Sequence, residues 1–98
     1  MQLEFSRFVE SDLDAIADYI AQDNPHRAIT FIQEIRARFH AIRHSPLLYQ
    51  LRPDIGKEAR MTTLGNYAIL FRVIGNSVRI ERVLYGGRDL PGIFDSPT

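Results

Sequence analysis

Apolar and polar residues follow two different periods along the chain, and the change falls near residue 58. Residues 2–8 alternate, which indicates a short strand. Apolar residues then recur every three or four positions until about residue 44, which is typical of amphipathic helices. From residue 58 onward the period is two, which again indicates strands. The length of 98 residues accommodates one domain, so we expect residues 1–98 to form a single α+β unit.

The first half of the chain predicts two helices. The first spans about 12–22, with Ser11 as its N-cap and acidic residues in its first turn. Asn24 then caps a second helix that begins at Pro25 and ends at about residue 44. Because the connection between them is short, we expect an antiparallel helical hairpin.

The second half predicts three strands, at 58–64, 67–74 and 77–85. Gly65-Asn66 and Gly75-Asn76 separate them and are typical two-residue hairpin turns. We interpret 45–57 as an irregular connection and 88–98 as a short tail.

The turn at Gly75-Asn76 sets the register of the last two strands. It places Phe71 opposite Ile80 and Arg72 opposite Arg79. One face then carries Ile69, Phe71, Val73, Val78 and Ile80, and the other carries Leu70, Arg72, Arg79 and Glu81. We expect the N-terminal strand and the helical hairpin to pack on one face of an antiparallel β-sheet, against the first set.

The charges balance overall but are segregated along the chain. Twelve basic and twelve acidic residues give a net charge of zero, which argues against a generic nucleic-acid binder. Residues 1–25 hold six acids and one arginine, whereas 26–98 hold eleven basic and six acidic residues. Five arginines lie in or just after the three-strand segment: Arg60, Arg72, Arg79, Arg82 and Arg88. This cluster suits an acidic partner or a phosphate backbone, and it equally suits an ordinary solvated surface.

No motif in the chain indicates catalysis or metal binding. There is no cysteine, and no serine belongs to a nucleophile motif. His40 and His44 have a spacing that can serve one metal ion, but no obvious third ligand accompanies them, so we expect no metal and no cofactor. No apolar segment reaches the ~20 residues that span a bilayer, and the first residues lack the basic region of a signal peptide. These features predict a cytoplasmic binding domain with no membrane contact.

Several segments, in order, resemble the ParE branch of the RelE/ParE toxin superfamily. Residues 12–21, DLDAIADYIA, are similar to its first helix. The opening of its second helix resembles PHRA at 25–28, and its central hairpin resembles YAILFRV at 67–73. The most specific segment is VRIERVLYGGRDL at 78–90, which is similar to the end of the family's last strand.

This resemblance implies a toxin of a type II toxin–antitoxin system. It implies a cognate, ParD-like antitoxin that wraps the toxin, and DNA gyrase as the target, with nucleic acid met only through the antitoxin or gyrase. Such a protein is an inhibitor and not an enzyme. We expect the partner-binding surface to include Arg60, Arg72, Arg79, Arg82, Tyr85, Arg88, Asp89 and Phe94.

The sibling RelE branch, which cuts messenger RNA on the ribosome, supplies an alternative. Its sheet lysines match positions near Ala59 and Met61, its arginine matches Ala68, and its C-terminal tyrosine matches Phe94. Only Arg88 agrees with that pattern. A phenylalanine cannot transfer a proton, so the resemblance disfavours nuclease activity. A degenerate member that binds its antitoxin without toxicity is a further alternative.

Overall fold

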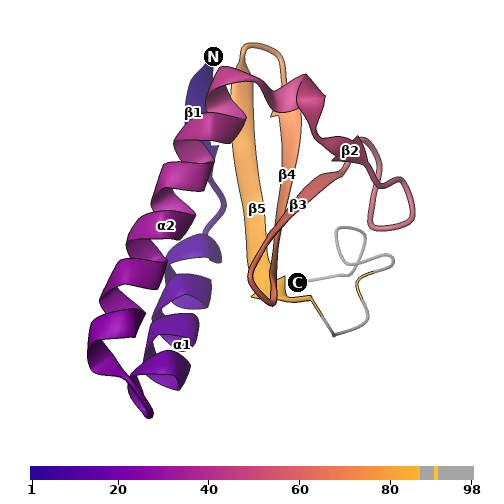
Figure 1. Cartoon of the computed structure of the whole chain (residues 1–98). Helices are drawn as coiled ribbons and strands as arrows, with labels where there is room; N and C mark the ends of the chain where they lie inside the picture. Colours follow the sequence, from indigo (N-terminus) through magenta and orange to yellow (C-terminus); the bar gives the residue numbers. More distant parts are fainter. Residues whose placement is uncertain (87–89, 91–98) are drawn as a thin grey trace.

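A five-stranded sheet carries two helices on one face (Figure 1). The computed structural model describes residues 1–86 and residue 90. In chain order the elements are β1 (Gln2–Phe5), α1 (Val9–Ala21), α2 (Pro25–His44), the 3-10 helix η1 (Pro46–Leu48), β2 (Gln50–Leu51), β3 (Arg60–Leu64), β4 (Tyr67–Ile74) and β5 (Ser77–Tyr85). This arrangement confirms the α+β class and the packing of a helical hairpin on one face of a sheet.

The N-terminal strand lies at one edge of this sheet. The strand order is β1-β5-β4-β3-β2, with β1 parallel to β5 and the other neighbours antiparallel. The sheet is therefore mixed, whereas the sequence predicted an antiparallel sheet. The helical hairpin explains the difference, because a helical crossover after β1 allows a later strand to return parallel to it.

The helix α2 begins where the sequence predicts. The Asn24 side chain accepts a hydrogen bond from the backbone N–H of Arg27 at 3.1 Å, and Pro25 occupies the first turn. Within the described residues, neither helix is long and apolar enough to cross a membrane.

The helix α1 begins earlier than the sequence predicts. It starts at Val9, with Phe8 at the cap position and no side-chain cap, and the Phe8 N–H donates to the Ser6 hydroxyl at 3.2 Å. The prediction of Ser11 as N-cap is therefore wrong, because Ser11 lies inside the first turn.

Both predicted hairpin turns are present. Gly65 and Gly75 have φ values of +58° and +57°, which a two-residue turn with glycine first requires. The register is the predicted one at the second turn, with Phe71 opposite Ile80 and Arg72 opposite Arg79.

The main core lies between the helices and strands β4 and β5. Its buried members are Val9, Leu13, Ile16, Phe31, Ile35, Phe39, Ile42, Ile69, Phe71, Val78, Ile80 and Val83. Four of the five sheet residues expected to face the helices belong to it, and Val73, next to the β4–β5 turn, is half-buried. Removal of these side chains from water supplies the main driving force for the packing of the helices on the sheet.

A β-bulge interrupts the pairing of β4 and β5. Leu70 pairs with Arg82 and Phe71 with Ile80, so Glu81 is an extra residue on β5. A bulge of this kind changes which residues of the following strand face each side. Val83 consequently joins the main core. Without the bulge, regular alternation from Ile80 would place Arg82 and Leu84 on that face instead.

A second apolar cluster covers part of the opposite face of the sheet. It consists of Ile55, Ala59, Ala68, Leu70, Leu84 and Leu90. The loop between β2 and β3 folds over the sheet here. The backbone N–H of Arg52 donates a hydrogen bond to the backbone carbonyl of Ala59 at 2.7 Å. The connection predicted to be irregular over 45–57 thus contains two short elements and closes a second core.

Asp12 joins α1 to β5 past the end of β1. Its carboxylate accepts two hydrogen bonds from the Arg82 guanidinium, at 2.8 and 2.9 Å, and one from the backbone N–H of Val83 at 3.0 Å. The Asp12 side chain is 10% exposed, so water competes weakly for these bonds. The sequence assigned Asp12 only a favourable interaction with the helix dipole.

We expect Asp12→Ala to lower the free energy of unfolding by about 2 kcal/mol, because it leaves the Arg82 guanidinium and the Val83 N–H without this acceptor. Urea denaturation measures the change. Asp14→Ala, at an exposed position of the same helix, is the control, and its effect should stay within about 0.5 kcal/mol. Equal losses for the two variants would contradict the linking role of Asp12.

Candidate functional site

Two of the sheet arginines share one carboxylate. Arg79 donates to Glu81 through Nε at 2.6 Å, and Nη2 of Arg72 lies 3.4 Å from the same carboxylate. Glu81 is the bulge residue, and its side chain is 15% exposed. It therefore offsets the repulsion between two arginines that face each other across the strands. We call these three residues the Arg72–Arg79–Glu81 cluster.

Two other predicted arginines make contacts within the fold. Arg82 binds Asp12, and its guanidinium carbon lies 4.8 Å from the centre of the Phe8 ring. The hydrogen bond to Asp12 raises the pKa of Arg82 above its usual value. Arg60 donates to the backbone carbonyl of Tyr49 at 2.6 Å. These contacts hold secondary-structure elements together, and they do not place Arg60 and Arg82 in one group with the Arg72–Arg79–Glu81 cluster.

The remaining predicted site residues divide into two groups. Tyr85 lies at the end of β5 with its side chain exposed. Arg88, Asp89 and Phe94 lie outside the described residues.

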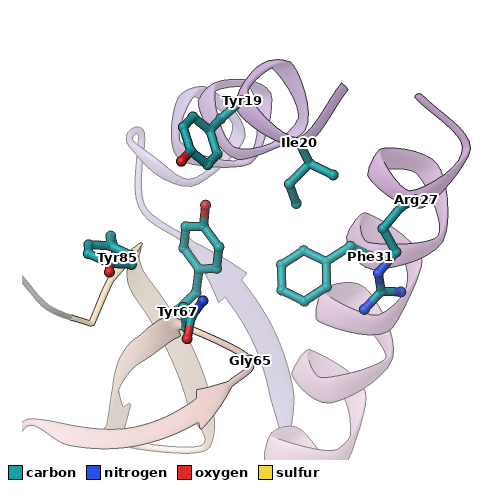
Figure 2. Close-up of a pocket in the computed structure, with 8 residues that line it drawn as sticks. Tyr19, Ile20, Arg27, Phe31, Gly65, Tyr67 and Tyr85 are labelled. Atoms are coloured by element: carbon teal, nitrogen blue, oxygen red, sulfur yellow. The ribbon is translucent and has the colours of Figure 1, made fainter. Parts of the chain in front are cut away.

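Tyr85 contributes to an open pocket of about 690 Å³ (Figure 2). We call it the aromatic pocket, and it is lined by Tyr19 and Ile20 of α1, Arg27 and Phe31 of α2, Gly65 and Asn66 of the β3–β4 turn, Tyr67 of β4 and Tyr85 of β5. Tyr67 is central: its ring centre lies 5.6 Å from that of Phe31 and 6.0 Å from that of Tyr85. Tyr19 and Tyr85 at the rim are 67% and 57% exposed.

The lining combines apolar rings with hydroxyl groups at their outer ends. Burial raises the pKa of the Tyr67 hydroxyl, and the neighbouring Tyr19 and Tyr85 add to the rise. The Arg27 guanidinium lies 5.1 Å from the centre of the Phe31 ring and also pairs with Glu34. None of the lining residues is a carboxylate or a histidine. Exposed aromatic walls of this kind suit the binding of an apolar or aromatic side chain from a protein partner.

Three aromatic members of the pocket were not among the predicted site residues: Tyr19, Phe31 and Tyr67. Helical periodicity places Phe31 on the buried face and gives no reason to single it out. The bulge brings Tyr85 opposite Tyr67, since regular pairing from the second turn would place Leu84 there. Tyr19 lies beside the apolar stripe of Leu13, Ile16 and Ile20 on α1, and an aromatic residue in this place was a sequence signal that could have indicated the site.

His40 and His44 of α2 do not belong to a metal site in the described part of the chain. No group of three or more histidine, cysteine, aspartate or glutamate residues is arranged there to hold an ion.

The chain is a small α+β domain with an open aromatic pocket between its helical hairpin and its sheet. The family model described as "ParE toxin of type II toxin-antitoxin system, parDE" matches residues 3–90. The chain therefore belongs to the ParE toxin family, which confirms the resemblance found in the sequence.

A solved structure supports this assignment. The structure titled "Chromosomal ParDE TA system from P. aeruginosa" is similar to this chain with a TM-score of 0.75 and 28% sequence identity. The similarity covers 87% of this chain and 95% of that chain. No curated protein matches the chain significantly.

We expect Tyr67→Phe to remove the part of the tyrosinate titration that occurs above the ordinary value of 10.0. Because the folded pKa is raised, the neutral hydroxyl stabilises the fold at pH values below 10, and this contribution is lost as the pH rises through the folded pKa. Ultraviolet absorbance of the tyrosinates measures the titration curves of the parent protein and of the variant. If the parent and the variant differ only near pH 10, Tyr67 is not shielded in this way. Tyr85→Phe is the matched control for loss of a hydroxyl at the exposed rim.

Proposed function

We propose that this chain is the toxin of a type II toxin–antitoxin pair that inhibits DNA gyrase in the bacterial cytoplasm and is neutralised by a ParD-like cognate antitoxin. The observation that carries this proposal is the family match over residues 3–90. The solved relative, whose title names a ParDE system, supports the expectation of an antitoxin.

The environment of the nuclease-related positions supports an inhibitor over an RNA-cutting enzyme. The positions that are lysines in the RelE branch lie near Ala59 and Met61, and Ala68 matches an arginine. Ala59 and Ala68 are buried in the second apolar cluster, and Met61 is partly buried against it. Placing a charge at Ala59 or Ala68 without a partner costs several kcal/mol, by general estimates for buried ions. Their apolar surroundings are therefore consistent with a sheet that binds protein rather than cleaves RNA.

Two surfaces supply the chemistry that a protein inhibitor needs. The aromatic pocket offers exposed tyrosines, which are enriched among the residues that dominate binding energy at interfaces. The Arg72–Arg79–Glu81 cluster carries a net positive charge, which favours an acidic partner and increases its rate of association. Neither surface requires a cofactor.

Induced expression of the chain in a bacterium should stop growth, and the purified protein should inhibit supercoiling by gyrase and cause cleaved DNA to accumulate. Co-expression of the protein encoded by the adjacent reading frame should restore growth. Supercoiling assays and ribosome-dependent RNA-cleavage assays on the same preparation distinguish the alternatives. Cuts in messenger RNA with unaffected gyrase would contradict the proposal and favour a RelE-type nuclease. Binding to the antitoxin without any toxicity would instead favour a degenerate member.

Arg79→Ala and Arg88→Ala should each weaken binding of the antitoxin or the target by ~1–3 kcal/mol if the interface desolvates the charge. Lys57→Ala is the matched control, since Lys57 is an exposed cation in the β2–β3 loop. Isothermal titration calorimetry with the antitoxin, and supercoiling assays with gyrase, measure the two effects. If both variants bind both partners as well as the control does, these arginines only solvate the surface.

A further inference from the structure

The edge strand β1 presents unpaired backbone along its outer side. The Gln2 N–H donates to the Asn76 carbonyl at 3.0 Å, and the Ser6 N–H donates to the Ile80 carbonyl at 2.9 Å. Parallel pairing alternates, so the backbone N–H and C=O groups of Leu3 and Phe5 point away from β5. Among the described strands, none lies beyond β1 on that side. Such an edge can accept one further strand.

An apolar groove of about 480 Å³ lies between this edge and α2. Leu3, Phe5 and Phe39 contribute its apolar surface. Phe5 is 45% exposed, and its ring centre lies 5.5 Å from that of Phe39. A large exposed aromatic beside an open strand edge is costly to leave in water, and it provides a contact for the side chains of an added strand.

The α2 side of the groove is basic. Arg36, His40 and Arg43 line it at intervals of four and three residues, which places them on one face of the helix. Arg36 also pairs with Glu10 at 3.1 Å, but both side chains are largely solvent-exposed, and an exposed ion pair contributes little that a new partner could not replace. No acidic residue lines the groove.

We propose that an extended, acidic segment of the cognate antitoxin adds to the outer edge of β1 as a sixth strand, with carboxylates against Arg36, His40 and Arg43 and an apolar side chain over Phe5. The proposal rests on the proposed function, since it names how that partner binds. Charge argues against a second copy of this chain in the same place. Symmetrical pairing of two β1 edges would bring the basic residues of two grooves together, which is unfavourable.

Amide hydrogen exchange of the complete toxin–antitoxin complex tests the mode of binding. In the free chain the Leu3 and Phe5 amides should exchange rapidly, whereas the Glu4 amide, which faces β5, should be protected. In the complex the Leu3 and Phe5 amides should slow by about tenfold or more, with Glu4 as the internal reference. If the complex forms and these two amides stay fast, the added strand is refuted and the proposed function stands. If no complex forms with the adjacent gene product, the proposed function itself fails.

Charge reversal tests the choice of an acidic segment. Arg43→Glu should weaken antitoxin binding by about tenfold or more, whereas Lys57→Glu makes the same change in net charge away from the groove and should have little effect. Both positions are exposed, and circular dichroism confirms that the variants fold. Equal weakening by the two variants would show that overall charge acts and would overturn a specific role for the groove. If the free chain dimerises and Arg43→Glu strengthens the dimer, β1 serves self-association, and the proposal is again overturned.

Discussion

The fold depends on which groups form hydrogen bonds with the backbone of β5 beyond the end of β1. The strand β1 stops at Phe5, while β5 continues to Tyr85, so the second half of β5 loses its neighbour on that side. Ser6 donates through its backbone N–H to the Ile80 carbonyl and through its hydroxyl to the Glu81 carbonyl, at 2.9 and 2.6 Å. Further along β5, the Asp12 carboxylate accepts a hydrogen bond from the backbone N–H of Val83. A buried donor left without a partner costs about 1–3 kcal/mol, so these contacts set the position of α1 on the sheet.

The bulge at Glu81 lies in the middle of this arrangement and has consequences on both faces of the sheet. It places the side chain of Val83 in the main core and that of Leu84 in the second apolar cluster. It also moves Tyr85 opposite Tyr67, which completes the aromatic pocket. The extra residue itself provides the carboxylate of the Arg72–Arg79–Glu81 cluster. One inserted residue thus determines the core, the pocket and the charge pattern of the sheet together.

Local signals explain which parts of the fold could be predicted. The cap at Asn24, the two glycine turns and the register as far as Phe71 and Ile80 all depend on residues close together in the chain, and all were confirmed. The bulge was missed because its stabilising bonds join residues far apart in the sequence, such as Ser6 and Glu81, which are 75 positions apart. The partner of Asp12 is 70 positions away, so an acidic residue in a first turn gave only the local interpretation. Predictions on Arg88, Asp89 and Phe94 lie outside the described residues and remain predictions.

The arrangement of the two candidate surfaces along α2 constrains how an antitoxin could act. The first turns of the helix, with Arg27 and Phe31, line the aromatic pocket, and the last turns, from Arg36 to Arg43, line the groove beside β1. At a rise of about 1.5 Å per residue, Arg27 and Arg43 lie about 24 Å apart along the axis. A strand added to β1 therefore leaves the aromatic pocket open unless the partner continues for roughly seven more extended residues. If the pocket is the surface that meets the target, neutralisation by direct blocking requires an antitoxin segment that extends over both halves of α2. With a shorter segment, the pocket must be covered by another part of the antitoxin or altered through a change in the toxin's own conformation.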